Sequence, residues 1–142
     1  MSQHIDFKQS GHLNAALYDP ATKTLSIDSL TGRWVNTNRQ TQGIAECSIA
    51  QEDDKFSVSG VAVGADDPII WPATEARVFA NLEEEAGQRA LALAVTFDFG
   101  FWRADAYLRV NKGVLVIVLF NTFQDKTGRS NYVTREFFYR PG

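Results

Sequence analysis

Polar and apolar side chains alternate strictly between Arg103 and Val110, so that four residues with ionisable side chains fall on one side of the chain. These residues are Arg103, Asp105, Tyr107 and Arg109. Alternation with a period of two is typical of a β-strand with two different faces. If the polar face points to water, it is an ordinary solvated surface. If it points inward, its charges must pair or hold a ligand with a carboxylate, hydroxyl or carbonyl group, because a lone buried charge costs several kcal/mol.

Glu136 supplies a second carboxylate, and with Asp105 and Tyr107 it forms the set of candidate acid–base groups. A carboxyl group in an apolar interior has its pKa raised and can exchange a proton near neutral pH. Such a set would support a cyclisation or isomerisation without a cofactor. Arg135, Glu75 and Arg77 are further candidate partners for an inward polar stripe.

Aromatic residues gather at two places where strands are expected to begin or end. Trp71 precedes Pro72, and Trp102 closes the run Phe99-Gly100-Phe101-Trp102. The mouths of β-barrels commonly hold small molecules, so both indoles are candidate ligand contacts, although packing in a satellite core explains them equally well. The loop from Asp125 to Tyr132 is rich in hydrogen-bonding groups and either closes over a ligand or is an ordinary polar turn.

Residue types exclude several classes of chemistry. The two histidines, His4 and His12, lie outside the expected barrel. A nucleophile inside the barrel would therefore have no histidine to act as its base. Cys47 is the single cysteine, and we expect a buried, inert thiol. We therefore predict no metal site, no cofactor and no nucleophilic triad.

The chain of 142 residues has a net charge of −3, with its arginines scattered among the strands. No basic field marks a nucleic-acid-binding surface. No segment approaches the roughly 18 apolar residues of a membrane-spanning helix, and the start MSQHIDFKQS lacks the apolar stretch of a secretory signal. We expect a cytoplasmic protein that neither binds nucleic acid nor inserts into membranes.

Runs of alternating residues separated by turn residues predict about eight strands. They are Gly32–Asn36, Gly43–Gln51, Lys55–Val63, Thr74–Asn81, Arg89–Asp98, Arg103–Val110, Val114–Phe120 and Tyr132–Tyr139. A short helix within Asn81–Leu93 is the strongest rival, but Gly87 interrupts it. The expected fold is all-β, an antiparallel up-and-down barrel in a single domain, with a β-sandwich as the alternative. Residues 31–142 form the barrel, and residues 1–30 add an N-terminal hairpin or lid built from Leu13–Tyr18 and Thr24–Asp28.

Two expected strands are apolar on both faces. Val114–Phe120 carries no polar residue, and Arg89–Phe97 alternates large apolar residues with small ones. A lone barrel shows one strand face to water, so something should cover these outer faces. We expect self-association, as a dimer, or cover by the N-terminal segment.

The segment Leu30-Thr31-Gly32-Arg33-Trp34 resembles the start of the calycin barrels, which include lipocalins, fatty-acid-binding proteins and avidins. The resemblance implies that Trp34 plugs the closed end of the barrel and that a late arginine, Arg135 or Arg140, lies over its indole. It is nearest to the avidin start, which implies a ligand contact at Asn36. No lipocalin T-D-Y motif is present, and the resemblance does not extend to a biotin pocket.

These observations favour a binding protein that holds a small hydrophobic or amphipathic molecule in the barrel lumen. The alternatives are the cofactor-independent cyclase or isomerase and a lectin-like or oligomeric interaction module that binds at exposed Trp71 or Trp102. Catalysis is not assigned. The candidate ligand-binding residues are Asn36, Trp71, Trp102, Arg103, Tyr107, Arg109, Tyr132 and Arg135.

Overall fold

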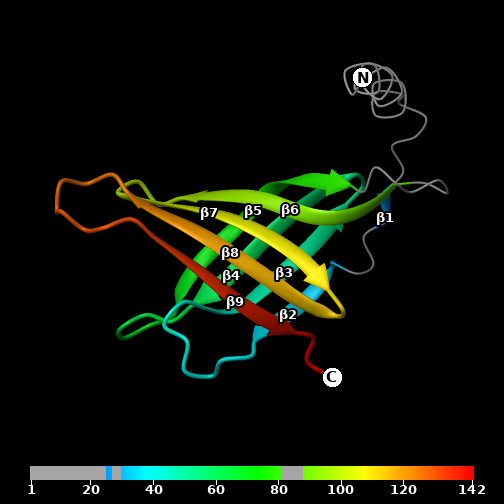
Figure 1. Ribbon diagram of the computed structural model, residues 1–142, viewed down its shortest axis with the longest axis horizontal. Helices are drawn as coiled ribbons and strands as arrows, with labels where there is room; N and C mark the ends of the chain where they lie inside the picture. Colours follow the sequence, from blue (N-terminus) through cyan, green and yellow to red (C-terminus); the bar gives the residue numbers. More distant parts are fainter. Residues whose placement is uncertain (1–24, 27–29, 81–87) are drawn as a thin grey trace, which may run out of the picture.

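The computed structural model describes residues 25–26, 30–80 and 88–142. Nine strands occur in this part of the chain (Figure 1). They are β1 (Leu25–Ser26), β2 (Gly32–Asn36), β3 (Ile44–Glu52), β4 (Lys55–Ala62), β5 (Ile69–Ala80), β6 (Gln88–Asp98), β7 (Trp102–Asn111), β8 (Val114–Phe123) and β9 (Tyr132–Tyr139). No helix is found in the described ranges, and hence none of the length and apolar character needed to cross a membrane.

Strands β2 to β9 pair in chain order, each antiparallel to the next. The ring closes because β9 also pairs with β2, through Val35 opposite Tyr139 and Asn36 opposite Phe138. The structure is thus the expected eight-stranded up-and-down barrel, and the sandwich alternative is wrong. β1 adds a parallel pairing to the start of β6. The other arm of the predicted N-terminal hairpin, Leu13–Tyr18, lies outside the described residues, as does the segment 81–87 of the rival helix.

One strand begins earlier than its sequence pattern predicts. β5 starts at Ile69, five residues before the expected Thr74, and contains Pro72. Proline has no backbone N–H to donate to a neighbouring strand. A segment that contains proline is therefore not normally predicted to be the interior of a strand. Here the pairing between β4 and β5 shifts register between Val58 and Gly60, and this bulge accommodates the proline.

The core consists of the inward side chains of all eight barrel strands. Along β7, for example, Ala104, Ala106 and Leu108 are buried, while their neighbours in sequence are more exposed. An eight-stranded barrel is just wide enough for such side chains to fill it. Hydrophobic burial across the ring therefore provides the main stabilisation of the fold.

Trp34 plugs one end of the barrel. It is completely buried, and its Nε1 donates a hydrogen bond of 2.9 Å to the carbonyl oxygen of Leu30. Of the two arginines expected over this indole, Arg140 occupies the place, with its guanidinium carbon 4.2 Å from the ring centroid. Arg140 also donates a hydrogen bond to the carbonyl oxygen of Thr31, so β9 is tied to the segment that leads into β2.

The outer face of β8 is apolar, as expected, but long side chains from both neighbouring strands flank it. Val116 lies between Arg109 and Phe137 in register, and Val118 lies between Tyr107 and Arg135. Both valines are consequently half-buried within the single chain. Self-association over this face and cover by the N-terminal segment stay predictions.

Replacing Trp34 by alanine should lower the free energy of unfolding by about 3–5 kcal/mol, because the change removes a fully buried indole and leaves a cavity. Urea denaturation followed by circular dichroism measures the loss. Ile70→Ala is the control, since Ile70 is 64% exposed and its truncation should change stability by no more than about 0.5 kcal/mol. Equal effects of the two substitutions would contradict the role of Trp34 as the plug.

Candidate functional site

The end of the barrel opposite Trp34 is open and holds a cavity of about 450 Å³. The β2–β3, β4–β5 and β8–β9 loops gather around this end, which lies on the left in Figure 1. The cavity is lined by Asn38, Thr41, Gln42, Gly43, Ile44, Ala62, Val63, Ile69, Trp71, Trp102, Leu119, Asn121, Tyr132, Thr134, Arg135 and Glu136. Its size is within the range of small-molecule sites.

Deeper in the barrel, side chains leave little space. The residual void among Ile44, Val58 and Phe97 measures about 10 Å³. A ligand enclosed along the barrel axis would have to displace these core residues. The mouth is therefore where the interior of the described barrel can admit a small molecule.

Glu136 is the polar centre of the cavity wall. Its Oε2 accepts two hydrogen bonds, one of 2.8 Å from Nδ2 of Asn36 and one of 2.6 Å from Oγ1 of Thr41. Its Oε1 has no hydrogen-bond partner among the described residues. A Cβ atom at Gly43 would lie 2.8 Å from Oε1, so the missing side chain at Gly43 leaves that oxygen approachable.

The β2–β3 loop is organised around this carboxylate. Asn36 ends β2 and uses its second amide hydrogen on the carbonyl oxygen of Ile44, at 2.9 Å. Its Oδ1 accepts a hydrogen bond from the backbone N–H of Asn38, and Oγ1 of Thr41 accepts one from the backbone N–H of Gly43. The donors to Glu136 are thus held in place before any ligand arrives.

Aromatic rings form the opposite wall. Trp71 makes edge contacts with Phe97, Phe99 and Trp102 at centroid distances of 4.9, 5.2 and 5.3 Å. Phe99 stacks on Trp102, whose Nε1 donates a hydrogen bond of 2.9 Å to Oδ1 of Asn121. Nε1 of Trp71, by contrast, is buried and has no hydrogen-bond partner among the described residues. An unsatisfied buried donor of this kind costs about 1–3 kcal/mol.

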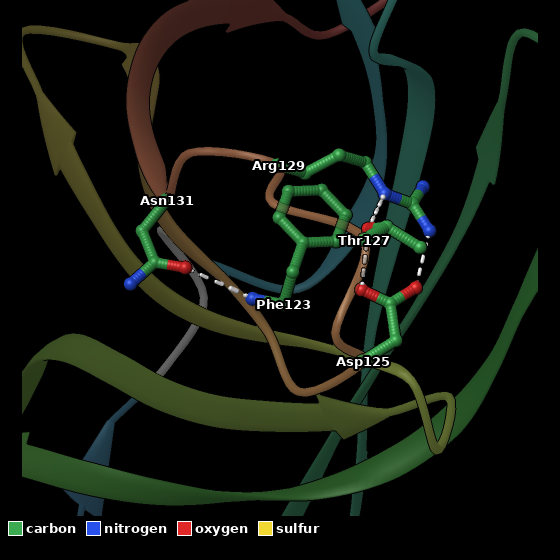
Figure 2. A network of polar contacts seen from close by, with 5 residues as sticks. All are labelled: Phe123, Asp125, Thr127, Arg129 and Asn131. Carbon is green, nitrogen blue, oxygen red and sulfur yellow. Dashed lines mark hydrogen bonds and ion pairs between the residues drawn. The ribbon is translucent and has the colours of Figure 1, made fainter.

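The β8–β9 loop, residues 124–131, carries its own polar network (Figure 2). Asp125 accepts hydrogen bonds from Thr127 and from Nη2 of Arg129, whose Nε donates to Oγ1 of Thr127. The Arg129 guanidinium also lies 4.8 Å from the ring centroid of Phe123 and 5.3 Å from that of Phe101. The network fixes the loop against the β6–β7 turn, beside the cavity.

The structure brings six of the predicted site residues to this end of the barrel. Five of them line the cavity: Trp71, Trp102, Tyr132, Arg135 and Glu136. The sixth, Asn36, donates a hydrogen bond to Glu136 from behind the cavity wall. The orientations of two differ from expectation. Trp71 is only 2% exposed, because it is part of the aromatic cluster, so an exposed lectin-like platform at this residue is wrong. The side chain of Arg135 lies over Phe137, on the outside of the barrel.

The polar stripe of β7 lies on the outer face, because Ala104, Ala106 and Leu108 occupy the inner one. The inward interpretation of the stripe is therefore wrong. Arg103 forms an ion pair with Asp105 at 3.5 Å, and Asp105 accepts a hydrogen bond from Thr96. Tyr107 and Arg109 line a separate outer hollow of about 500 Å³. Of the three acid–base candidates, only Glu136 lines the mouth cavity.

Sequence reasoning missed Thr41, Gly43 and Asn121, which shape the polar part of the cavity. Thr41 and Gly43 belong to a polar loop, and Asn121 follows the apolar run Val114–Phe120 at a position that is buried in the structure. An asparagine that continues the inward alternation of β8 is the one signal that the sequence offered. The contact of Thr41 with Glu136 joins residues 95 positions apart, which no local pattern reveals.

A comparison with protein-family models, with curated proteins and with solved structures finds no match to this chain. The fold and the cavity are therefore interpreted on their own geometry. Among the described residues, no group of three or more His, Cys, Asp and Glu side chains is arranged to hold a metal ion.

The pKa of Asp125 is held below its usual value, first by the hydrogen bond from Thr127 and then by the Arg129 guanidinium. Because the pKa is lowered on folding, the loop network contributes its stability above the ordinary pKa of aspartate, near 4, and loses it as the pH falls below that. NMR titration of the Asp125 carboxyl carbon should show its midpoint moving up in Thr127→Val. An unchanged midpoint would contradict the network.

Burial raises the pKa of the Cys47 thiol to about 12. At pH 8 only about one thiol in ten thousand is then ionised, and the thiolate is the nucleophile. Ellman's reagent should react slowly with the folded protein and quickly in urea. Rapid reaction of the folded protein would place this thiol at the surface.

Proposed function

We propose that this protein binds a small amphipathic molecule in the mouth cavity. The observation that carries the proposal is the combination of a 450 Å³ space with an aromatic wall at Trp71 and Trp102 and a pre-organised carboxylate at Glu136. Sites for small molecules are typically concave and mostly apolar, with a few fixed polar groups that set orientation. The apolar part of the ligand would lie against the indoles and Leu119, and its polar part against Glu136.

We further propose that the barrel is of the calycin type. Supporting this are the closed antiparallel meander, the Gly32-Arg33-Trp34 start and the packing of Arg140 over Trp34. A location in the cytoplasm and a dimeric state remain expectations from the sequence. The cyclase alternative now depends on Glu136 alone, since Asp105 and Tyr107 lie on the outer face.

A neutral polarity-sensitive dye such as Nile red should bind with saturable stoichiometry and alter the Trp emission. Ile69→Trp should weaken binding by about tenfold, because Ile69 lines the cavity and the larger indole takes up part of the space. The matched control is Ile70→Trp: this neighbouring residue is absent from the cavity lining and points outward, so binding should stay unchanged.

Two results would count against the proposal. One is a dye response that is non-saturable in the natural protein. The other is equal weakening by Ile69→Trp and Ile70→Trp, which would place the dye on the outside of the barrel. Native mass spectrometry of freshly purified protein adds an independent measurement, since a retained small molecule would be lost in Ile69→Trp.

A further inference from the structure

We propose that the ligand carries a protonated amine, which lies against Oε1 of Glu136 with its apolar body between the aromatic side chains of the mouth. The inference rests on the proposed function and specifies the ligand for the same cavity.

The two carboxylate oxygens of Glu136 are used unequally. Oε2 accepts hydrogen bonds from Asn36 and Thr41, whereas Oε1 accepts none within the described part of the chain. No ion pair joins Glu136 to a described cation. A partly buried carboxylate without a counter-charge favours a cationic partner, because pairing offsets the cost of its desolvation.

The formal charge that faces the cavity is negative. Glu136 and Arg135 are the two formally charged residues in the lining. They are adjacent on β9 and therefore point to opposite faces of the strand. The Arg135 guanidinium carbon lies 5.6 Å from the ring centroid of Phe137, an exposed outer residue, so its positive charge is held outside. The cavity itself is left with the negative charge of Glu136.

Aromatic rings form part of the cavity wall. Trp71, Trp102 and Tyr132 all line the cavity, and the ring of Tyr132 stacks on Phe123 at 6.0 Å. The faces of aromatic rings attract organic cations, and tryptophan does so most strongly. The same rings offer apolar contact to the body of the molecule. A carboxylate ligand would instead meet repulsion from Glu136.

Access to Oε1 of Glu136 depends on the glycine at position 43. Gly43 has no positive φ angle that would require glycine, yet a Cβ atom there would come within 2.8 Å of Oε1. The small residue at this position therefore keeps the oxygen open toward the cavity. This relation provides a substitution that hinders Oε1 without removing its charge.

The test compares three probes with one shared body: 3-phenylpropylamine, 3-phenylpropanol and 3-phenylpropanoate, titrated by calorimetry at pH 7 into the full chain. The amine should bind about tenfold more tightly than the alcohol, and the carboxylate should bind most weakly. Glu136→Gln should reduce the affinity for the amine by about tenfold and leave that for the alcohol within about threefold.

Gly43→Ala should also weaken amine binding while net charge is retained, because the added Cβ atom would crowd Oε1; it is the variant to use if Glu136→Gln does not fold. Glu75→Gln is the charge-matched control, because it removes one negative charge from an exposed position away from the cavity. Amine affinity should be unchanged there.

The outcomes separate the two proposals. Tighter binding of the amine that is lost in Glu136→Gln and Gly43→Ala supports the inference. If the alcohol and Nile red bind but the amine binds no better, or if Glu75→Gln weakens the amine as much as Glu136→Gln does, the amine inference is wrong and the cavity remains. If none of the three probes nor Nile red binds, the proposed function itself is wrong.

Discussion

The volume of an eight-stranded barrel constrains everything else in this protein. Eight strands enclose a space that apolar side chains can fill, and the central void among Ile44, Val58 and Phe97 measures only about 10 Å³. The same burial that stabilises the fold leaves a ligand no room along the axis. At the end away from Trp34 the lining includes the polar Glu136 and Asn121 and the small Gly43, and there a cavity of about 450 Å³ opens.

Several polar groups at this end are compatible with the core because they are hydrogen-bonded to one another. Asn36 uses both amide hydrogens, and Asn121 accepts from the indole of Trp102. Buried polar groups of this kind are costly when unpaired and stabilising when paired. Among the described residues, Oε1 of Glu136 has no hydrogen-bond partner, and Nε1 of Trp71 is buried without one.

The sequence predicted the strands well because alternation is a local property. β2 and β9 have the bounds expected from their patterns, and most other strands agree within a few residues. It did not reveal which face of Arg103–Val110 is inward, because alternation is symmetric between the two faces until the rest of the ring is known. The segment from Ile69 to Ala73 was missed because a proline argues against a strand interior, and the β5 bulge that accommodates it is visible only once β5 is paired with β4.

The candidate site was predicted less completely, for a related reason. Trp71, Trp102 and Glu136 could be named from their residue types, but their grouping depends on loops that meet only after the ring has closed. Asn36 and Glu136 are 100 positions apart in the chain. The seam that joins them is the pairing of β2 with β9, which involves only two residue pairs. The ring and its pocket therefore cannot form until β9, the last strand to be synthesised, has paired with β2. Ring closure and pocket assembly therefore occur together. A molecule bound in the pocket would stabilise the pairing of β2 with β9 and favour the folded chain by mass action.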